Sequence, residues 1–251
     1  MAETEKRKHI FGLIGKNISY SFSRGYFSKK FDALGLGDYT YENFDIQDSS
    51  ELKTVLSKPE INGLNVTIPY KEAIIPYLDE LNEEAKSIGA VNTIKYSKTG
   101  TVGYNTDAYG FERSIVPLLK SHHKNALILG TGGASKAIVY VLDQLGISHQ
   151  YVSRNPTKNQ LNYSDLERTR FKEFQLIINC TPLGTFPNIE DKPLIPYDYI
   201  NSSYLLYDLV YNPLETAFLK EGKQKGATIQ NGLSMLEHQA EKAWEIWNTA
   251  G

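Results

Sequence analysis

Two α/β domains with mostly parallel sheets are predicted by three observations. Strand patterns alternate with helical patterns in both halves of the chain. A glycine-rich turn in the second half joins a buried strand directly to a helix. The length of 251 residues allows two modest domains that each bury a core. Ligands of such sheets bind beyond the C-terminal ends of the strands, so the expected active site is the cleft between the two domains.

The first half alternates strands and helices as far as a hairpin. Short apolar or alternating runs predict strands at residues 9–15, 39–44, 61–67, 90–96 and 101–104. Helical patterns are expected at 24–34, 49–56, 73–78 and 83–88. The last two strands form a hairpin around Ser97-Lys98-Thr99-Gly100. A longer helix at 107–119 then marks the junction between the domains.

The second half has the order of a dinucleotide-binding domain. Its predicted strands lie at residues 126–129, 149–152, 176–180, 205–211 and 227–230. The final helix is predicted to begin at Ser234, which forms a capping-box pattern with Glu237. We therefore expect a substrate-binding domain of residues 1–106 plus 234–251 and a Rossmann-type domain of residues 107–233. In this arrangement the C-terminal helix returns to the substrate domain.

The glycine-rich turn predicts a phosphate-binding loop. Gly130, Gly132, Gly133 and Ala134 follow the apolar strand 126–129 and open a helix that stops at Gly146. Gly130 permits the turn, and Gly132 lets the backbone approach an anion that the N–H groups of the helix start can bind. Ser135 occupies the third small position of the G-x-G-x-x-G pattern, so the fingerprint is a variant.

The end of the next strand favours NADP over NAD. An NAD site would place Asp or Glu there for the ribose hydroxyls, but no carboxylate occurs between His149 and Asp165. Ser153, Arg154 and Lys158 occupy this turn instead. The guanidinium of Arg154 can bind a 2′-phosphate through its planar fork. The alternative is a solvated basic turn without a ligand.

Composition excludes several classes of partner. The formal net charge is −2 and no long basic block occurs, so nucleic acid is not an expected partner. No apolar run approaches the roughly 20 residues that span a bilayer, and no signal-peptide pattern opens the chain. Cys180 is the only cysteine, which excludes an intrachain disulfide and favours a small buried side chain in a cytoplasmic protein. No metal site is predicted.

Several polar residues are placed where an alcohol or carbonyl substrate could react. Asn65 and Thr67 alternate onto one face of the third strand, and Lys71 follows the strand end. Asp107 opens the interdomain helix. The pattern alone favours structural roles, with Lys71 a surface lysine and Asp107 a helix cap. Gln239 interrupts an apolar stripe of the last helix, as either a satisfied core amide or a ligand for a polar group.

Seven motifs in register resemble those of the shikimate dehydrogenase family, and the resemblance runs nearly end to end. The motifs are Gly12-Leu13-Ile14-Gly15 with Ser21-Phe22-Ser23, Asn65-Val66-Thr67-Ile68-Pro69-Tyr70-Lys71, Ala90-Val91-Asn92-Thr93, Gly103-Tyr104-Asn105-Thr106-Asp107, the glycine loop with Asn179-Cys180-Thr181-Pro182, Asp208-Leu209-Val210-Tyr211-Asn212-Pro213, and Met235-Leu236 with Gln239. The resemblance implies the NADP-dependent, reversible reduction of 3-dehydroshikimate to shikimate in the chorismate pathway of aromatic amino acid biosynthesis.

The resemblance also implies roles for individual residues. Lys71 and Asp107 look like the catalytic pair. The implied substrate ligands are Ser21 and Ser23 with Tyr211 at the carboxylate, and Asn65, Thr67, Asn92 and Gln239 at the ring hydroxyls or around Lys71. Thr181 and Gly232 are implied as further cofactor ligands, in addition to the residues of the glycine-rich turn and of the basic turn. A monomer or a homodimer is expected.

Two departures from the family pattern bear on the cofactor. Ser153-Arg154-Asn155 replaces the usual Asn-Arg-Thr, so discrimination against NAD is expected to be weaker. Cys180 and Thr185 replace the usual Ala and Met near the nicotinamide side. The nearest rival is a quinate or quinate/shikimate dehydrogenase that uses NAD or NADP. A non-catalytic dinucleotide-binding sensor and a folate-linked dehydrogenase of similar shape are further alternatives.

Overall fold

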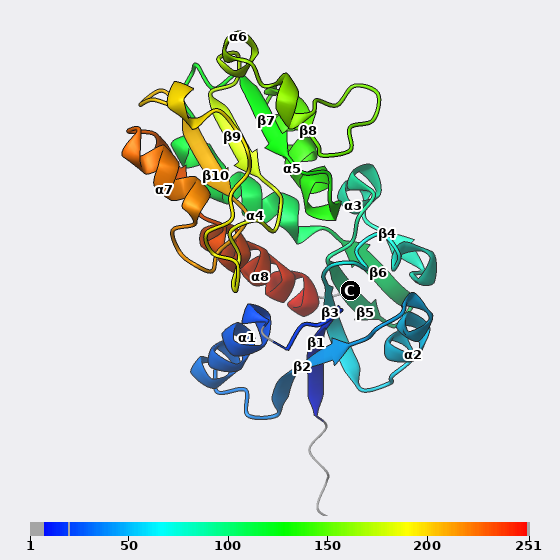
Figure 1. Ribbon diagram of the computed structural model, residues 1–251. Helices are drawn as coiled ribbons and strands as arrows, with labels where there is room; N and C mark the ends of the chain where they lie inside the picture. The colour runs from blue at the N-terminus through cyan, green and yellow to red at the C-terminus, as the bar shows by residue number, and fades with distance from the viewer. Residues whose placement is uncertain (1–7, 20, 250–251) are drawn as a thin grey trace, which may run out of the picture. The chain divides into compact units, whose positions relative to one another are not determined.

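The computed structural model describes residues 8–19 and 21–249, and it divides the chain into two compact units (Figure 1). The first unit comprises residues 1–106 and 240–251, and the second comprises residues 107–239. The division at residue 240 falls inside the last helix, α8 (Leu233–Asn248). Each unit contains its own sheet.

The first unit is built on a six-stranded mixed sheet with the order β2-β1-β3-β5-β6-β4. Its strands are β1 (His9–Gly15), β2 (Tyr39–Asp45), β3 (Ile61–Val66), β4 (Glu80–Leu81), β5 (Thr93–Ser97) and β6 (Gly100–Tyr104). Strand β1 runs parallel to both β2 and β3, whereas β5 is antiparallel to β3 and β6. The predicted hairpin is β5–β6. The two-residue strand β4 was not predicted because a strand this short has no readable alternation.

Helices cover both faces of this sheet. They are α1 (Phe22–Ala33), α2 (Leu52–Leu56) and α3 (Glu83–Ile88), with short 3₁₀ turns at Ser49–Glu51 and Ile75–Tyr77. Helix α1 packs on one face together with the C-terminal half of α8, in a core that includes Phe11, Phe27 and Trp247. A second core on the other face includes Ile14, Leu64 and Val66.

Gly63 allows α8 to lie against the sheet. A Cβ atom at this position would stand 2.5 Å from the indole of Trp247, closer than any real contact. The same indole donates a hydrogen bond to the carbonyl oxygen of Ile94 at 3.0 Å. The missing side chain on β3 therefore fixes where the end of the chain packs in this unit.

The second unit contains a five-stranded parallel sheet with the order β11-β10-β9-β7-β8. Its strands are β7 (Asn125–Leu129), β8 (Ser148–Val152), β9 (Leu176–Asn179), β10 (Leu205–Asp208) and β11 (Thr228–Gln230). Its helices are α4 (Thr106–Ile115), α5 (Gly133–Gln144), α6 (Arg168–Phe171), α7 (Ala217–Gln224) and the start of α8. Short 3₁₀ turns lie at Val116–Leu118, Tyr163–Asp165 and Tyr197–Tyr199. The α/β class and the parallel sheet agree with the prediction.

Helix α1 begins two residues before the predicted start, and the helices predicted at 49–56 and 73–78 are partly or wholly 3₁₀ turns. Two further differences, at α4 and α8, have a local cause. Helix α4 ends at Ile115 and continues as the 3₁₀ turn Val116–Leu118, because Pro117 disfavours α-helical backbone at the residue before it. Helix α8 begins at Leu233, whose N–H donates to the side chain of Asn231 at 3.2 Å, so Ser234 lies in the first turn instead of at the cap. Within the described ranges, no helix is both long and apolar enough to cross a membrane.

Candidate active site

Six of the predicted substrate and catalytic residues gather at one edge of the first sheet. Strands β1 and β3 are parallel, so both end at this edge, and antiparallel β5 begins there opposite Asn65. The loops and helix starts at these ends contain Ser21, Ser23, Asn65, Thr67, Lys71 and Asn92. The fold thus brings together residues that are up to 71 positions apart.

The two serines lie at the start of α1. Ser21 is the N-cap, and its hydroxyl oxygen accepts a hydrogen bond from the backbone N–H of Ser23 at 3.2 Å. Both side chains are half-buried. The N-terminus of a helix carries a partial positive charge, so two hydroxyls in this place suit a carboxylate.

Asn65 lies at the centre of a hydrogen-bond network at the end of β3. Its amide nitrogen donates to the carbonyl oxygen of Asn92 at 3.2 Å and to the hydroxyl of Thr93 at 3.1 Å. Its amide oxygen accepts from the hydroxyl of Tyr41 at 2.8 Å. Because partners on β2 and around the start of β5 hold this amide, its orientation is fixed within the unit.

Asn92 is buried and tied to the residue that opens α4. Its amide oxygen accepts from the backbone N–H of Thr106 at 2.7 Å, and its amide nitrogen donates to the Thr106 hydroxyl at 3.0 Å. The hydroxyls of Thr93 and Thr106 are 3.2 Å apart. These contacts fix the chain directly before Asp107.

The loop that contains Lys71 is fixed by its backbone. The N–H of Thr67 donates to the carbonyl oxygen of Ile14 at 2.8 Å, and the carbonyl oxygen of Lys71 accepts from the N–H of Val91 at 2.8 Å. Between them the hydroxyl of Tyr70 donates to the carbonyl oxygen of Ile46 at 2.9 Å. These hydrogen bonds fix the loop at the sheet edge that bears Asn65 and Thr67. Lys71 is half-buried on this loop.

In the second unit, Asp107 and Gln239 belong to two helices that approach closely. Asp107 is buried in the first turn of α4, and Gly110 follows three positions later. A Cβ atom at Gly110 would lie 2.4 Å from the carbonyl oxygen of Met235 and 3.2 Å from the Cβ of Gln239. Residues three apart share a helix face, so Gln239 lies along the face of α4 that bears Asp107.

The glycine loop has the geometry that the sequence predicts. Gly130 has φ of +99°, in the region that favours glycine, and it lies directly after β7. Gly132 caps α5 and has open space where a side chain would stand. The hydroxyl of Ser135 donates to the carbonyl oxygen of Gly132 at 2.7 Å and lies 3.2 Å from the hydroxyl of Tyr151. Serine at the third small position thus closes the turn and ties α5 to β8.

The basic turn lies beyond the end of β8. Arg154 and Lys158 are exposed, and Ser153 accepts a hydrogen bond from the N–H of Asn155 at 3.2 Å. The turn returns to the sheet at Leu161, whose carbonyl oxygen accepts from the N–H of Ser153 at 2.9 Å. The charge of Arg154 lowers the pKa of Tyr163 against the larger raising effect of burial, which places the guanidinium near that phenol.

A buried carboxylate organises the ends of β9 and β10. Asp208 accepts hydrogen bonds from Thr216 at 2.6 Å and from Asn179 and the N–H of Val210 at 3.0 Å each. Burial raises the pKa of Asp208 to about 6 despite these donors. The amide oxygen of Asn179 in turn accepts from the hydroxyl of Thr181 at 2.6 Å. Thr181 is thus held in a fixed turn.

The remaining predicted residues of this unit flank the same sheet edge. Tyr211 is half-buried three residues after the end of β10. Gly232 is buried, its N–H donates to the carbonyl oxygen of Val210 at 3.1 Å, and a Cβ there would lie 2.1 Å from the carbonyl oxygen of Leu209. Cys180 is half-buried, and burial raises the pKa of its thiol. The parallel strands thus bring the predicted cofactor residues to one edge of the sheet.

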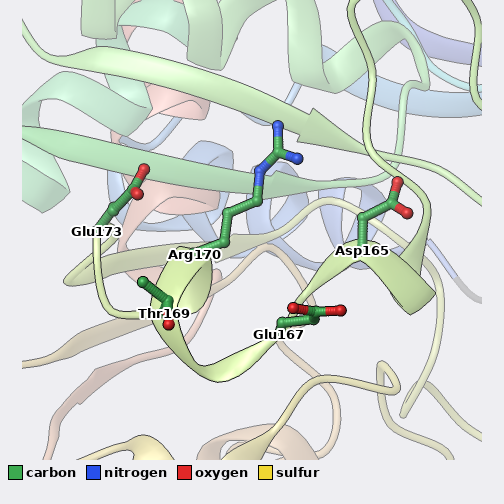
Figure 2. Close-up of a pocket in the computed structure, with 5 residues that line it drawn as sticks. All are labelled: Asp165, Glu167, Thr169, Arg170 and Glu173. Atoms are coloured by element: carbon green, nitrogen blue, oxygen red, sulfur yellow. The ribbon is translucent and has the colours of Figure 1, made fainter.

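A hollow elsewhere in the second unit contains none of the predicted residues. It lies over α6 and is lined by Asp165, Glu167, Thr169, Arg170 and Glu173 (Figure 2). Its three carboxylates outnumber its single cation, which does not suit a phosphate ligand. Across the part of the chain that the structure describes, no cluster of three His, Cys, Asp or Glu residues could hold a metal ion.

Several residues that support the site had no predicted role in it, although all but the first stand in the motifs. They are Tyr41, Thr93, Thr106, Asn179 and Asp208. The alternation of residues 39–44 puts the two tyrosines, Tyr39 and Tyr41, on one face of the strand, but it does not show that the ring of Tyr41 reaches Asn65 across β1. Only the register of three strands reveals that contact.

Comparison with known proteins points to one family. The shikimate dehydrogenase substrate-binding domain matches residues 13–94. An NADP(+) shikimate dehydrogenase of Methanococcus maripaludis is 38% identical over 263 residues, covering 97% of this chain and 92% of that relative. A shikimate 5-dehydrogenase structure from Thermus thermophilus, in complex with NADP(H) and shikimate, is 30% identical, with a TM-score of 0.82 over 95% of this chain and 93% of that one. Quinate dehydrogenase from Corynebacterium glutamicum, in complex with NAD, is 27% identical, with a TM-score of 0.83 over 96% of this chain and 94% of that one.

Proposed function

Since this chain belongs to the shikimate dehydrogenase family, we propose that Lys71 and Asp107 are its catalytic acid–base pair. The reaction is the NADP-dependent, reversible reduction of 3-dehydroshikimate to shikimate, which belongs to aromatic amino acid biosynthesis. The observation that supports the assignment of Lys71 is the cluster at the edge of the first sheet. There a lysine on a backbone-fixed loop lies with two helix-start hydroxyls and a network of amides.

The proton transfer follows from the chemistry of Lys71. Its ammonium donates a proton to the carbonyl oxygen of the substrate during reduction, and the neutral amine accepts that proton in the reverse direction. Asp107, in the first turn of α4, is the other member of the proposed pair.

The same cluster explains how the substrate is oriented. Ser21 and Ser23 at the start of α1 bind the carboxylate, while Asn65, Thr67 and Asn92 bind the ring hydroxyls or hold Lys71 in place. Tyr211 and Gln239, which belong to the second unit, stay predicted substrate ligands. A small triol acid requires many neutral hydrogen-bond partners. Each polar group of the site left unpaired by an analogue costs about 1–3 kcal/mol, so such a site rejects analogues that lack a hydroxyl.

The residues of the second unit fit a dinucleotide with a 2′-phosphate. The open space at Gly132 and the uncapped start of α5 suit the pyrophosphate, together with Gly130, Gly133 and Ala134. The exposed Arg154 and Lys158, with Ser153, suit the 2′-phosphate. Thr181 and Gly232 line the rest of this edge. When bound, NADPH supplies the hydride.

We assign the substrate to the domain of residues 1–106 plus 234–251 and NADP to that of residues 107–233. This assignment rests on the sheet edges at which the two sets of residues lie. A cytoplasmic location and a monomeric or homodimeric state stay predictions.

A quinate or quinate/shikimate dehydrogenase is the second candidate, because a quinate dehydrogenase has a similar fold. Steady-state assays with shikimate and quinate, each with NADP and with NAD, distinguish the two. We expect the highest kcat/KM for shikimate with NADP. A higher kcat/KM for quinate with NAD would show that the protein is instead a quinate dehydrogenase. If 3-dehydroshikimate does not oxidise NADPH at all in the presence of the protein, the non-catalytic sensor is favoured.

The same assay with Arg154→Gln tests the cofactor site. The variant is expected to raise KM for NADP at least about tenfold and to leave KM for NAD within about twofold, since charge-assisted hydrogen bonds contribute about 1.5–3 kcal/mol. Arg170→Gln is the matched control, because Arg170 is another exposed arginine of this unit. An equal effect of both substitutions would remove Arg154 from the 2′-phosphate site.

A further inference from the structure

We infer that Gln150 is a positioning residue for the 2′-phosphate of NADP, because its side chain ties the segment that contains Lys158 to β8. The inference rests on the proposed function, in which Arg154 and Lys158 bind that phosphate. It adds a residue that is not among the predicted cofactor ligands and that acts through the shape of the basic turn. All of these residues belong to the second unit.

The base of the basic turn is fixed by the sheet. The N–H of Leu161 donates to the carbonyl oxygen of Tyr151, and the N–H of Ser153 donates to the carbonyl oxygen of Leu161, both at 2.9 Å. Leu161 also pairs with Val152 in a parallel bridge, and its side chain is buried in the core of this unit. The chain therefore leaves β8 and returns beside the same strand, at the edge of the sheet.

The exposed Lys158 lies in the outer part of the basic turn, within the four residues 157–160. The N–H of Gln160 donates to the carbonyl oxygen of Thr157 at 3.0 Å, and the amide oxygen of Gln160 accepts from the N–H of Thr157 at 3.1 Å. Asn159 has φ of +73°, which asparagine adopts more readily than most residues with a side chain. A positive φ at the third residue but not at the second is the pattern of a type II turn. Both hydrogen bonds lie within these four residues, and neither joins them to β8.

Gln150 makes that connection. Its amide nitrogen donates to the carbonyl oxygen of Asn159 at 2.6 Å. A carbonyl oxygen can only accept, so the group that faces it must be the amide nitrogen. Gln150 is a half-buried residue of β8, and Asn159 directly follows Lys158. This hydrogen bond therefore ties the segment of Lys158 to the strand that Arg154 follows.

A tied turn favours binding of NADP for two reasons. The phosphate meets Lys158 on a segment that is already held in place, so less conformational freedom is lost on binding. The tie is also a neutral amide, and no carboxylate occurs between His149 and Asp165, so no negative side chain of this segment repels the phosphate. Because NAD lacks the 2′-phosphate, its binding does not depend on this hydrogen bond.

Gln150→Met tests this role, because methionine keeps an unbranched side chain of similar length and removes the amide donor. We expect KM for NADP to rise about 3- to 10-fold, the range for one hydrogen bond, while KM for NAD stays within about twofold. In a Lys158→Gln background the same substitution should raise KM for NADP no further, because Gln150 acts through Lys158. A loss of stability alone would not separate the two cofactors in this way.

Gln175→Met is the matched control. Gln175 is another half-buried glutamine of this unit, and its amide nitrogen donates to the carbonyl oxygen of Lys172 at 2.5 Å. It lies directly before the start of β9, whereas the basic turn follows the end of β8. The control should leave KM for both cofactors within about twofold. A selective rise of KM for NADP in this variant would show that the effect does not depend on the basic turn, and would overturn the inference.

The remaining outcomes separate the inference from the proposed function. If Lys158→Gln raises KM for NADP but Gln150→Met does not, or if the two effects multiply in the double variant, the role of Gln150 is overturned and the phosphate site stands. If Lys158→Gln leaves KM for NADP unchanged, the assignment of Lys158 to the phosphate fails, and the inference fails with it.

Discussion

At the scale of single residues, the reaction depends on the amine of Lys71. Lys71→Ala removes the proton donor and leaves the hydroxyl and amide groups of the cluster in place. We expect kcat to fall by about 10²–10⁴-fold, the usual contribution of general acid–base catalysis, with KM for shikimate changed much less. Single-turnover kinetics with 3-dehydroshikimate and NADPH measure this step directly.

Lys86→Ala is the control for the loss of an exposed lysine from the first unit, and it should retain wild-type turnover. A Lys71→Ala variant with more than about a tenth of the wild-type turnover would contradict the general-acid role.

At the scale of elements, the contact between α4 and α8 depends on Gly110. Gly110→Ala would place a Cβ atom 2.4 Å from the carbonyl oxygen of Met235. This oxygen belongs to the backbone of α8, so it cannot move aside by a change of rotamer as a side-chain atom can. We expect a loss of about 1–3 kcal/mol in the free energy of unfolding, as in other overpacked sites. KM for shikimate should also rise, because the displaced α8 contains Gln239.

Gly25→Ala is the matched control for this helix contact. Gly25 lies on α1 with nothing within 4 Å of an added Cβ. The substitution should raise stability by about 0.5–1 kcal/mol, since alanine loses less backbone freedom than glycine, and it should not change KM. Urea unfolding of both variants decides the matter, and equal stability of the two would refute the close approach at Gly110.

At the scale of the whole molecule, the buried carboxylate of Asp208 makes stability depend on pH. Burial raises its pKa from 3.8 to about 6, so the folded protein binds this proton more tightly than the unfolded chain. The stabilisation is therefore complete below the unfolded pKa near 4 and is lost as pH rises to about 6 and above. At about 1.4 kcal/mol per pKa unit, the change is on the order of 3 kcal/mol.

Asp208→Asn should remove this part of the pH dependence. Urea unfolding between pH 4.5 and 7.5 should show that the stability of the wild type falls with rising pH relative to that of the variant. Asp32→Asn on the exposed side of α1 is the control, and its difference from the wild type should not vary in this way. A constant difference for Asp208→Asn would show that the carboxylate has an ordinary pKa.

The sequence alone predicts the elements whose signals are local. The apolar run 126–129 and the glycines that follow it predict β7, the turn after it and the start of α5 without reference to any distant residue. The order of the motifs identified the family, and family membership is confirmed by relatives that cover nearly the whole chain. Boundaries next to Pro117 and Ser234 were less accurate, because there a local signal competes with the continuation of a helix.

Only the tertiary structure determined which side chains form hydrogen bonds with each other. Tyr41, Asn65 and Thr93 lie on three strands, and their hydrogen bonds depend on the parallel register of β1 with β2 and β3 and on the antiparallel register of β5. The raised pKa of Asp208 likewise requires burial between β9, β10 and the start of α7. Local sequence sets backbone preference and periodicity, whereas desolvation and hydrogen-bond partners arise only when distant segments pack together.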